Sequence, residues 1–156
     1  MTYFNGNLHI VSYPHCVLRI HLETMQCQQV ELPEPAKNGA HLGNSVGCLC
    51  YFSGNDNNKL SVWMLESGSN TYKWVLKHNI SLKSLTVGSI RFLAFHPELE
   101  MIYLLVNGKL VSYDMSNKRI EEVGDFGGEK ERCYLVQIWL FQFSNCVSDC
   151  LLKEKL

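Results

Sequence analysis

The sequence predicts an all-β fold in which one antiparallel unit is repeated about three times. Runs that alternate apolar and polar residues, as a strand with one buried face requires, recur in pairs along the chain. Turn-forming residues separate the two runs of each pair. Apolar residues at helical spacing are scarce, and residues 144–156 are the one modest helical candidate. We therefore expect antiparallel sheet almost throughout, with at most a short helix at the C-terminus.

The first unit begins close to the N-terminus. Its strands are expected at residues 8–13, 17–23 and 28–32. Leu18, Ile20 and Leu22 repeat with a period of two, so they share one face of the second strand. Pro14 marks the turn between the first two strands. The segment therefore has the pattern of a hairpin followed by a further strand.

The second and third units repeat this order. Their strands are expected at residues 48–52, 59–66 and 72–80, and at residues 101–106, 109–115 and 119–123. The turn of the second unit, residues 53–58, is rich in Gly, Asn and Asp, which favour loops. The turn of the third unit is Asn107-Gly108, the strongest short-range hairpin signal, because both turn positions require positive φ.

The spacing of the units indicates a particular architecture. Aligned on Leu18, Leu60 and Leu110, the units recur after 42 and then 50 residues, in the range of β-propeller blades. A complete propeller of four to eight blades at this period needs roughly 170–350 residues. Because the chain has 156 residues, we expect a partial propeller of about three antiparallel blades over residues 1–149, followed by a tail at residues 150–156.

A partial propeller leaves strand edges unpaired. We expect such edges at residues 3–8 and along a final strand at residues 134–143. Open edges offer free backbone N–H and C=O groups and promote association. The isolated chain is therefore expected to associate, unless residues 144–156 fold as a helix over an edge.

Charge and hydropathy argue against several classes of partner. The 14 Lys and Arg residues oppose 15 Asp and Glu, which gives a formal net charge of −1 and no field that would gather nucleic acid or anionic lipid. Apolar runs such as residues 92–95 and 102–106 are far shorter than the roughly 20 residues of a membrane helix. The N-terminus lacks the pattern of a secretory signal. We expect a cytoplasmic or nuclear protein, or both, with neither nucleic-acid nor membrane partners.

The cysteines and histidines do not match a metal site. Seven cysteines, an odd number without a secretory signal, indicate free thiols rather than disulfides. Cys48 and Cys50 would share a strand face, but structural zinc usually draws on Cys-x₂₋₄-Cys pairs within turns. A turn separates His9, His15 and His21, so we interpret them as surface or satisfied histidines. The sequence predicts neither a metal nor a cofactor.

Motifs of catalysis are also missing. The tripeptide Asp125-Phe126-Gly127 occurs in kinases, but the glycine-rich loop and the catalytic Asp loop do not accompany it. No Gly-x-Ser-x-Gly elbow is present. We interpret the chain as a binding module rather than an enzyme, with Trp63 and Trp74 in core packing.

A set of short segments occurs in a fixed order along residues 1–149. They are Phe4-Asn5-Gly6-Asn7-Leu8-His9, Val30-Glu31-Leu32-Pro33, Gly47-Cys48-Leu49-Cys50, Leu60-Ser61-Val62-Trp63-Met64-Leu65-Glu66, Trp74-Val75-Leu76-Lys77-His78-Asn79-Ile80, His96-Pro97 and Leu110-Val111-Ser112-Tyr113-Asp114-Met115. In this order and spacing the chain resembles the plant F-box-associated domain, most closely the branch of the family expanded in grasses.

The resemblance implies a kelch-like β-propeller that follows an F-box and recruits a substrate protein to a Skp/cullin/F-box ubiquitin ligase. An F-box is a helical segment of roughly 40–50 residues, and no helical periodicity of that size occurs here. Binding to a Skp-type adaptor is therefore expected only if an F-box lies upstream. The alternative is a truncated, F-box-less binding protein or competitor with no role in ubiquitin ligation.

The target protein would bind at blade-end loops, where exposed aromatic and polar residues gather. The candidate loops are residues 13–15, 55–58, 67–72, 98–100 and 125–132, with Tyr13, His15, Asn55, Asp56, Asn70, Tyr72, Glu98, Asp125 and Arg132 as candidate contact residues. The sequence does not identify the target.

Overall fold

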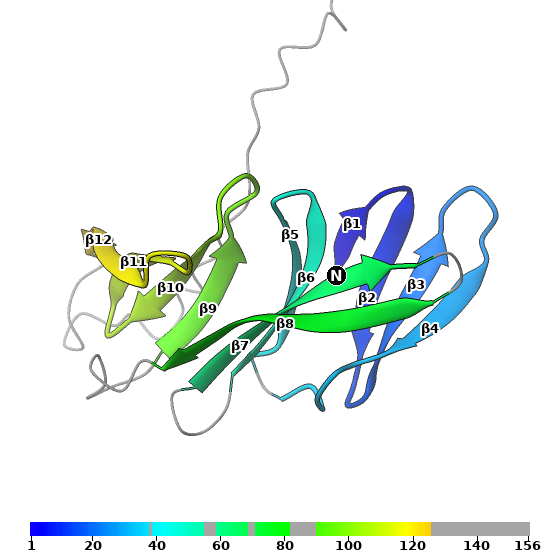
Figure 1. The fold of residues 1–156 in the computed structure, drawn as a ribbon, viewed down its shortest axis with the longest axis horizontal. Coiled ribbons are helices and arrows are strands. Elements are labelled where there is room, and N and C mark those ends of the chain that lie inside the picture. Colours follow the sequence, from blue (N-terminus) through cyan, green and yellow to red (C-terminus); the bar gives the residue numbers. More distant parts are fainter. Residues whose placement is uncertain (38, 55–58, 69–70, 82–89, 126–156) are drawn as a thin grey trace, which may run out of the picture.

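Three small antiparallel sheets make up the fold. The computed structural model describes residues 1–37, 39–54, 59–68, 71–81 and 90–125. In these ranges the chain forms twelve strands and no helix. Each sheet contains four strands that are consecutive in the sequence, and Figure 1 shows the sheets side by side. The predicted all-β fold is confirmed, whereas the helix expected at residues 144–156 and the strand expected at residues 134–143 lie outside the described residues.

Sheet 1 contains the first predicted unit. Its strands are β1 (Thr2–Phe4), β2 (Asn7–Ser12), β3 (Cys16–His21) and β4 (Cys27–Glu31). Asn5 and Gly6 join β1 to β2 with φ of 46° and 73°, as a tight type I′ hairpin turn requires. Buried Val17 on β3 pairs with buried Val30 on β4. The face of sheet 1 that carries these two side chains is therefore the face that packs against the rest of the protein.

Sheets 2 and 3 follow the same plan. Sheet 2 consists of β5 (His41–Ser45), β6 (Cys48–Gly54), β7 (Lys59–Ser67) and β8 (Tyr72–Ser81). Sheet 3 consists of β9 (Ile90–Phe95), β10 (Met101–Val106), β11 (Lys109–Asp114) and β12 (Arg119–Asp125). The turn at Asn107 and Gly108 has positive φ at both residues, so the predicted hairpin is confirmed.

The sheets are arranged as neighbouring blades. The first strands of successive sheets contact one another, β1 with β5 and β5 with β9. In Figure 1, β4 and β12 lie at the two outer ends of the array. Inner strands that meet while outer strands diverge are typical of a propeller. The chain therefore has the partial, propeller-like fold of about three blades that the spacing predicts.

The main core lies between sheets 2 and 3. Its buried members include Phe52, Leu60, Val62, Ile80, Phe92, Phe95, Ile102, Leu104, Val111 and Tyr113. The ring of Phe92 stacks on Phe52 with centroids 4.1 Å apart and meets Phe95 edge-on at 4.9 Å. Gly43 on β5 lies close against this aromatic group. A Cβ at that position would be 2.6 Å from Cδ2 of Phe95.

A smaller cluster joins sheet 1 to sheet 2 and includes both predicted core tryptophans. Trp63 and Trp74 pack with fully buried Tyr51. Trp63 Nε1 donates to Glu34 Oε1 at 3.2 Å, and Trp74 Nε1 donates to the carbonyl oxygen of Glu31 at 2.8 Å. The prediction that these tryptophans serve core packing is confirmed.

The described part of the chain contains no helix long and apolar enough to cross a membrane.

Candidate functional site

The turns lie on two opposite edges of the blade array. We call the upper rim the edge formed by the turns at residues 5–6, 22–26, 46–47 and 96–100, which are uppermost in Figure 1. The lower rim is the opposite edge, with the turn at residues 13–15 and the linker at residues 32–37. Antiparallel strands require this division, because successive turns of one sheet alternate between its two ends.

Two predicted contact residues lie in a braced turn on the lower rim. Tyr13 is 59% exposed, and His15 is exposed beside it. The Pro14 carbonyl oxygen accepts a hydrogen bond from Ala36 N at 2.6 Å, and the His15 carbonyl oxygen accepts one from Leu32 N at 2.8 Å. The linker to sheet 2 therefore fixes the backbone of this turn and leaves the Tyr13 side chain exposed.

The other predicted residues do not join this turn. Glu98 is exposed on the upper rim. Asp125 ends β12, where one of its carboxylate oxygens lies 4.0 Å from Lys109 Nζ. Tyr72, the last residue of a candidate loop and the first of the strand expected at residues 72–80, begins β8 and is half-buried, with the Arg19 guanidinium carbon 5.0 Å from its ring centroid.

The remaining candidate contact residues, Asn55, Asp56, Asn70 and Arg132, lie outside the described residues. The described candidates are therefore divided between two rims and do not form one site.

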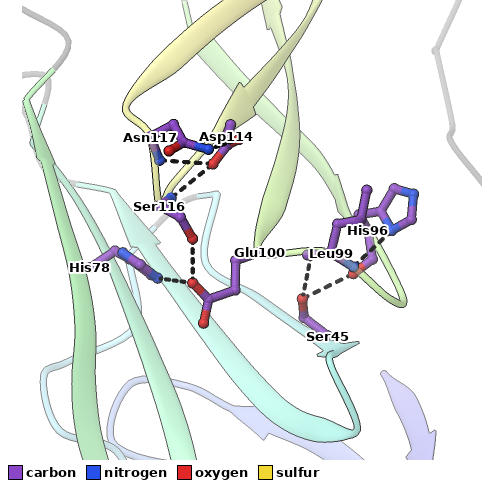
Figure 2. Close-up of polar contacts among 8 residues, drawn as sticks. All are labelled: Ser45, His78, His96, Leu99, Glu100, Asp114, Ser116 and Asn117. Atoms are coloured by element: carbon purple, nitrogen blue, oxygen red, sulfur yellow. Dashed lines mark hydrogen bonds and ion pairs between the residues drawn. The ribbon is translucent and has the colours of Figure 1, made fainter.

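Backbone contacts between blades brace the upper rim. Val46 N donates to the Pro97 carbonyl oxygen at 2.8 Å. The Ser45 hydroxyl donates to the carbonyl oxygens of His96 and Leu99, at 2.9 and 3.2 Å, as Figure 2 shows. His96 Nδ1 in turn accepts hydrogen bonds from the backbone N–H groups of Glu98 and Leu99. The turn between β5 and β6 and the turn between β9 and β10 are therefore held as one rigid unit.

A second polar group at the junction of sheets 2 and 3 centres on Glu100. Its Oε2 accepts a hydrogen bond from the Ser116 hydroxyl at 2.6 Å and lies 3.6 Å from His78 Nε2 (Figure 2). Asp114 accepts hydrogen bonds from the backbone N–H and the side-chain amide of Asn117 and from the backbone N–H of Ser116, and these bonds, those from Asn117 above all, hold its pKa below the usual value. These side chains are already engaged with one another, so we assign them to joining the blades.

Exposed apolar side chains occupy the turns of the upper rim. Leu22, Met25, Val46 and Leu99 are 47%, 70%, 50% and 51% exposed. Val46 has a φ of 48°, a left-handed conformation that β-branched residues rarely adopt. Asn5 holds the equivalent position in the turn between β1 and β2, and Asn107 holds the first position of the turn between β10 and β11. Sequence reasoning missed Val46, because the strand that precedes it, β5, was not predicted.

A polar hollow of about 300 Å³ opens on the same rim. It is lined by Asn7, Arg19, His21, Thr24, Gln26, Cys27 and Gln28. Strand pairing puts Asn7 opposite His21 and His9 opposite Arg19, so these residues share the face of sheet 1 that is turned toward sheet 2. Arg19 is the one residue of this lining that carries a permanent charge.

Burial shifts the pKa of a described thiol and of a described histidine. Cys16, Cys27, Cys48 and Cys50 are free thiols, and burial raises the pKa of Cys50 to about 12, which keeps this thiol protonated at neutral pH. Burial, followed by the charge of Arg19, lowers the pKa of His9. The prediction that His9 is a surface or satisfied histidine is wrong, since it is 3% exposed and its Nδ1 has no hydrogen-bond partner among the described residues.

Over the described ranges, no three His, Cys, Asp or Glu side chains are placed to hold one metal ion together.

A scan of the chain against protein-family models finds no match, and neither does a search of curated protein sequences.

Proposed function

We propose that this chain is a protein-binding module whose partner docks on the upper rim. The observation that carries the proposal is the left-handed conformation of Val46 at an exposed, braced turn. A valine there costs about 1–2 kcal/mol relative to a residue that tolerates this conformation. Because the side chain is half exposed, burial in the chain's own core returns little of that cost. Contact with a partner would bury the apolar side chain of Val46 and so offset this cost.

The surroundings of Val46 support the same function. Leu99 lies on the neighbouring turn, whose backbone bonds directly to Ser45 and Val46. Leu22 and Met25 are further exposed apolar side chains on the same rim, in the turn between β3 and β4 of sheet 1. Rigid apolar side chains bind with little loss of conformational entropy, and exposed apolar groups of this kind are typical of interaction sites. Binding here is non-covalent, and no catalytic step is assigned.

The biological setting follows from the resemblance and remains part of the proposal. A propeller-like fold agrees with the substrate-recognition domain of a Skp/cullin/F-box ubiquitin ligase, which would present the bound partner for ubiquitination. The alternative is a binding protein or competitor without a ligase role. An F-box encoded in frame upstream of Met1 would favour the first reading, and a stop codon directly upstream would favour the second.

The test is a substitution that separates stability from binding. Val46→Asn suits the left-handed turn and removes the apolar tip, so relief of the cost of about 1–2 kcal/mol should raise Tm by roughly 2–8 °C. Val123→Asn is the control, because Val123 is 55% exposed on β12, away from the upper-rim turns. Proteins captured from an extract of the native cells are then quantified by mass spectrometry for both variants.

We expect Val46→Asn to reduce capture of the partner by about tenfold, the loss of one well-placed apolar contact, while Val123→Asn captures the wild-type amount. If Val46→Asn both lowers Tm and leaves capture unchanged, Val46 serves the fold alone and the upper rim is not the docking surface.

A further inference from the structure

The polar hollow on sheet 1 contains a cation with no carboxylate partner. Arg19 Nη1 donates to Gln28 Oε1 at 3.3 Å, and the Arg19 guanidinium lies over the Tyr72 ring. Both neighbours are neutral, and no carboxylate pairs with Arg19 among the residues that the structure describes. By contrast, Arg119, which lines a second hollow on sheet 3, is paired with Glu121 at 2.9 Å. The sheet 1 hollow is therefore positively charged.

A buried acceptor lines the same hollow. Asn7 is 3% exposed, and its Nδ2 donates to the Asn5 carbonyl oxygen at 2.5 Å. Its Oδ1 has no hydrogen-bond partner in the described part of the chain. Buried polar atoms normally have a hydrogen-bond partner, so this oxygen is free to accept a hydrogen bond from an N–H or O–H group of a ligand. Asn7 and Arg19 lie on adjacent strands and on the same sheet face, and both line the hollow.

We propose that this hollow binds a carboxylate carried beside an amide N–H. The guanidinium of Arg19 presents paired N–H donors that match a carboxylate. Asn7 Oδ1 accepts the amide N–H of the same ligand. A peptide C-terminus has this chemistry, and so does an aspartate side chain next to its own backbone amide.

This inference rests on the proposed function in one respect, which is that the carboxylate belongs to the protein docked on the upper rim. Leu22 and Met25 lie in the turn that also supplies Thr24 and Gln26 to the hollow. A partner that covers the exposed apolar side chains of this turn would bring its chain to the opening of the hollow. The apolar contact and the charged contact would then belong to one docked segment.

The test uses small probes and the full chain, labelled with ¹⁵N and observed by NMR. N-acetylglycine represents a peptide C-terminus, N-acetylaspartic acid α-amide represents an aspartate side chain, and N-acetylglycinamide is the neutral control. Each is added at constant ionic strength up to roughly 20 mM, because one charge-assisted contact supports binding in the millimolar range. We expect saturable shifts in the Asn7 side-chain amide and in the backbone amides of Arg19 and Thr24.

Saturation with N-acetylglycine alone assigns the hollow to a C-terminus, and saturation with the aspartate probe, alone or in addition, assigns it to a side-chain carboxylate. Either result supports the proposal. Arg19→Gln should weaken binding at least tenfold, whereas Arg91→Gln, which removes an exposed arginine on β9, should leave it unchanged. Arg19→Lys keeps the charge and loses the paired donors, so its affinity for the probe should lie between those of wild type and Arg19→Gln.

Equal shifts with the neutral amide, no saturation with either acid, or binding that survives both Arg19 variants would overturn the proposal. The probes involve no partner protein. A failure here therefore leaves the Val46 test standing, and a failure of the Val46 test leaves a positive titration standing.

Discussion

Replacing Gly43 with alanine tests the packing of sheet 2 against sheet 3. The new Cβ would lie 2.6 Å from Cδ2 of Phe95, whereas ordinary contact begins at 3.4 Å. The ring must therefore move away by about 0.8 Å, the difference between these two distances. Phe95 is 2% exposed and its ring is held by Phe92, which is stacked on Phe52. The ring therefore has little room to yield.

The magnitude follows from two opposing effects. Overpacking of a core costs about 1–3 kcal/mol. Alanine restricts the unfolded chain more than glycine does, which offsets about 0.4–1 kcal/mol. The net loss of about 1–2 kcal/mol corresponds to a fall in Tm of roughly 2–8 °C for a chain of this size.

Thermal unfolding followed by circular dichroism measures the effect. Gly124→Ala is the matched control, because no atom lies within 4 Å of a Cβ at Gly124, and its Tm should equal or slightly exceed that of wild type. Adding Phe95→Leu to Gly43→Ala should relieve the clash, so the double variant should lose less stability than the sum of the two single changes. Equal Tm values for the Gly43 and Gly124 variants would refute the described contact between β5 and β9.

Three further predictions concern titration, thiol reactivity and association. Burial lowers the pKa of His9 and of His41 below the usual 6.5, so the unfolded chain binds more protons and stability should fall as pH drops below about 6.5. A series of Tm measurements against pH should show a shallower slope for His9→Gln and for His41→Gln than for wild type, and slopes equal to that of wild type would contradict the burial of these rings. Native alkylation followed by mass spectrometry should modify exposed Cys27 well before buried Cys50, and equal rates would contradict the burial described. Light scattering should show a dimer or larger species, because the strand edges of a partial propeller are open, and a stable monomer would show that the edges are covered.

The hairpins could be predicted because their signals are local. Asn107-Gly108 between two alternating runs defines β10 and β11 without reference to the rest of the chain. The first strand of sheet 2 was missed for the converse reason. Gly43 and Asn44 have low β propensity, and β5 forms because Gly43 allows Phe95 to approach and Asn44 Nδ2 donates to the Tyr3 carbonyl oxygen at 2.8 Å. Both contacts join residues far apart in the sequence.

The candidate site could be predicted only in general terms. Turn chemistry indicated that loops lie at blade ends, and Tyr13 and Glu98 are indeed in turns. It could not show which turns share a rim, since that depends on how neighbouring sheets meet. The hollow was equally hidden, because Asn7 and Arg19 become neighbours only through the pairing of β2 with β3 and Tyr72 approaches Arg19 from another sheet.

Site-specific photo-crosslinking tests the central claim, that a partner protein docks on the upper rim. A benzophenone side chain is placed at Leu99 on the upper rim, at Tyr13 on the lower rim and at Val123 on β12, all of which are exposed, and the chain is irradiated in an extract of the native cells. We predict one discrete adduct from Leu99, lost when Val46→Asn is introduced, and none from Val123. Adducts from Tyr13 alone, or equal adducts from all three positions, would contradict docking on the upper rim.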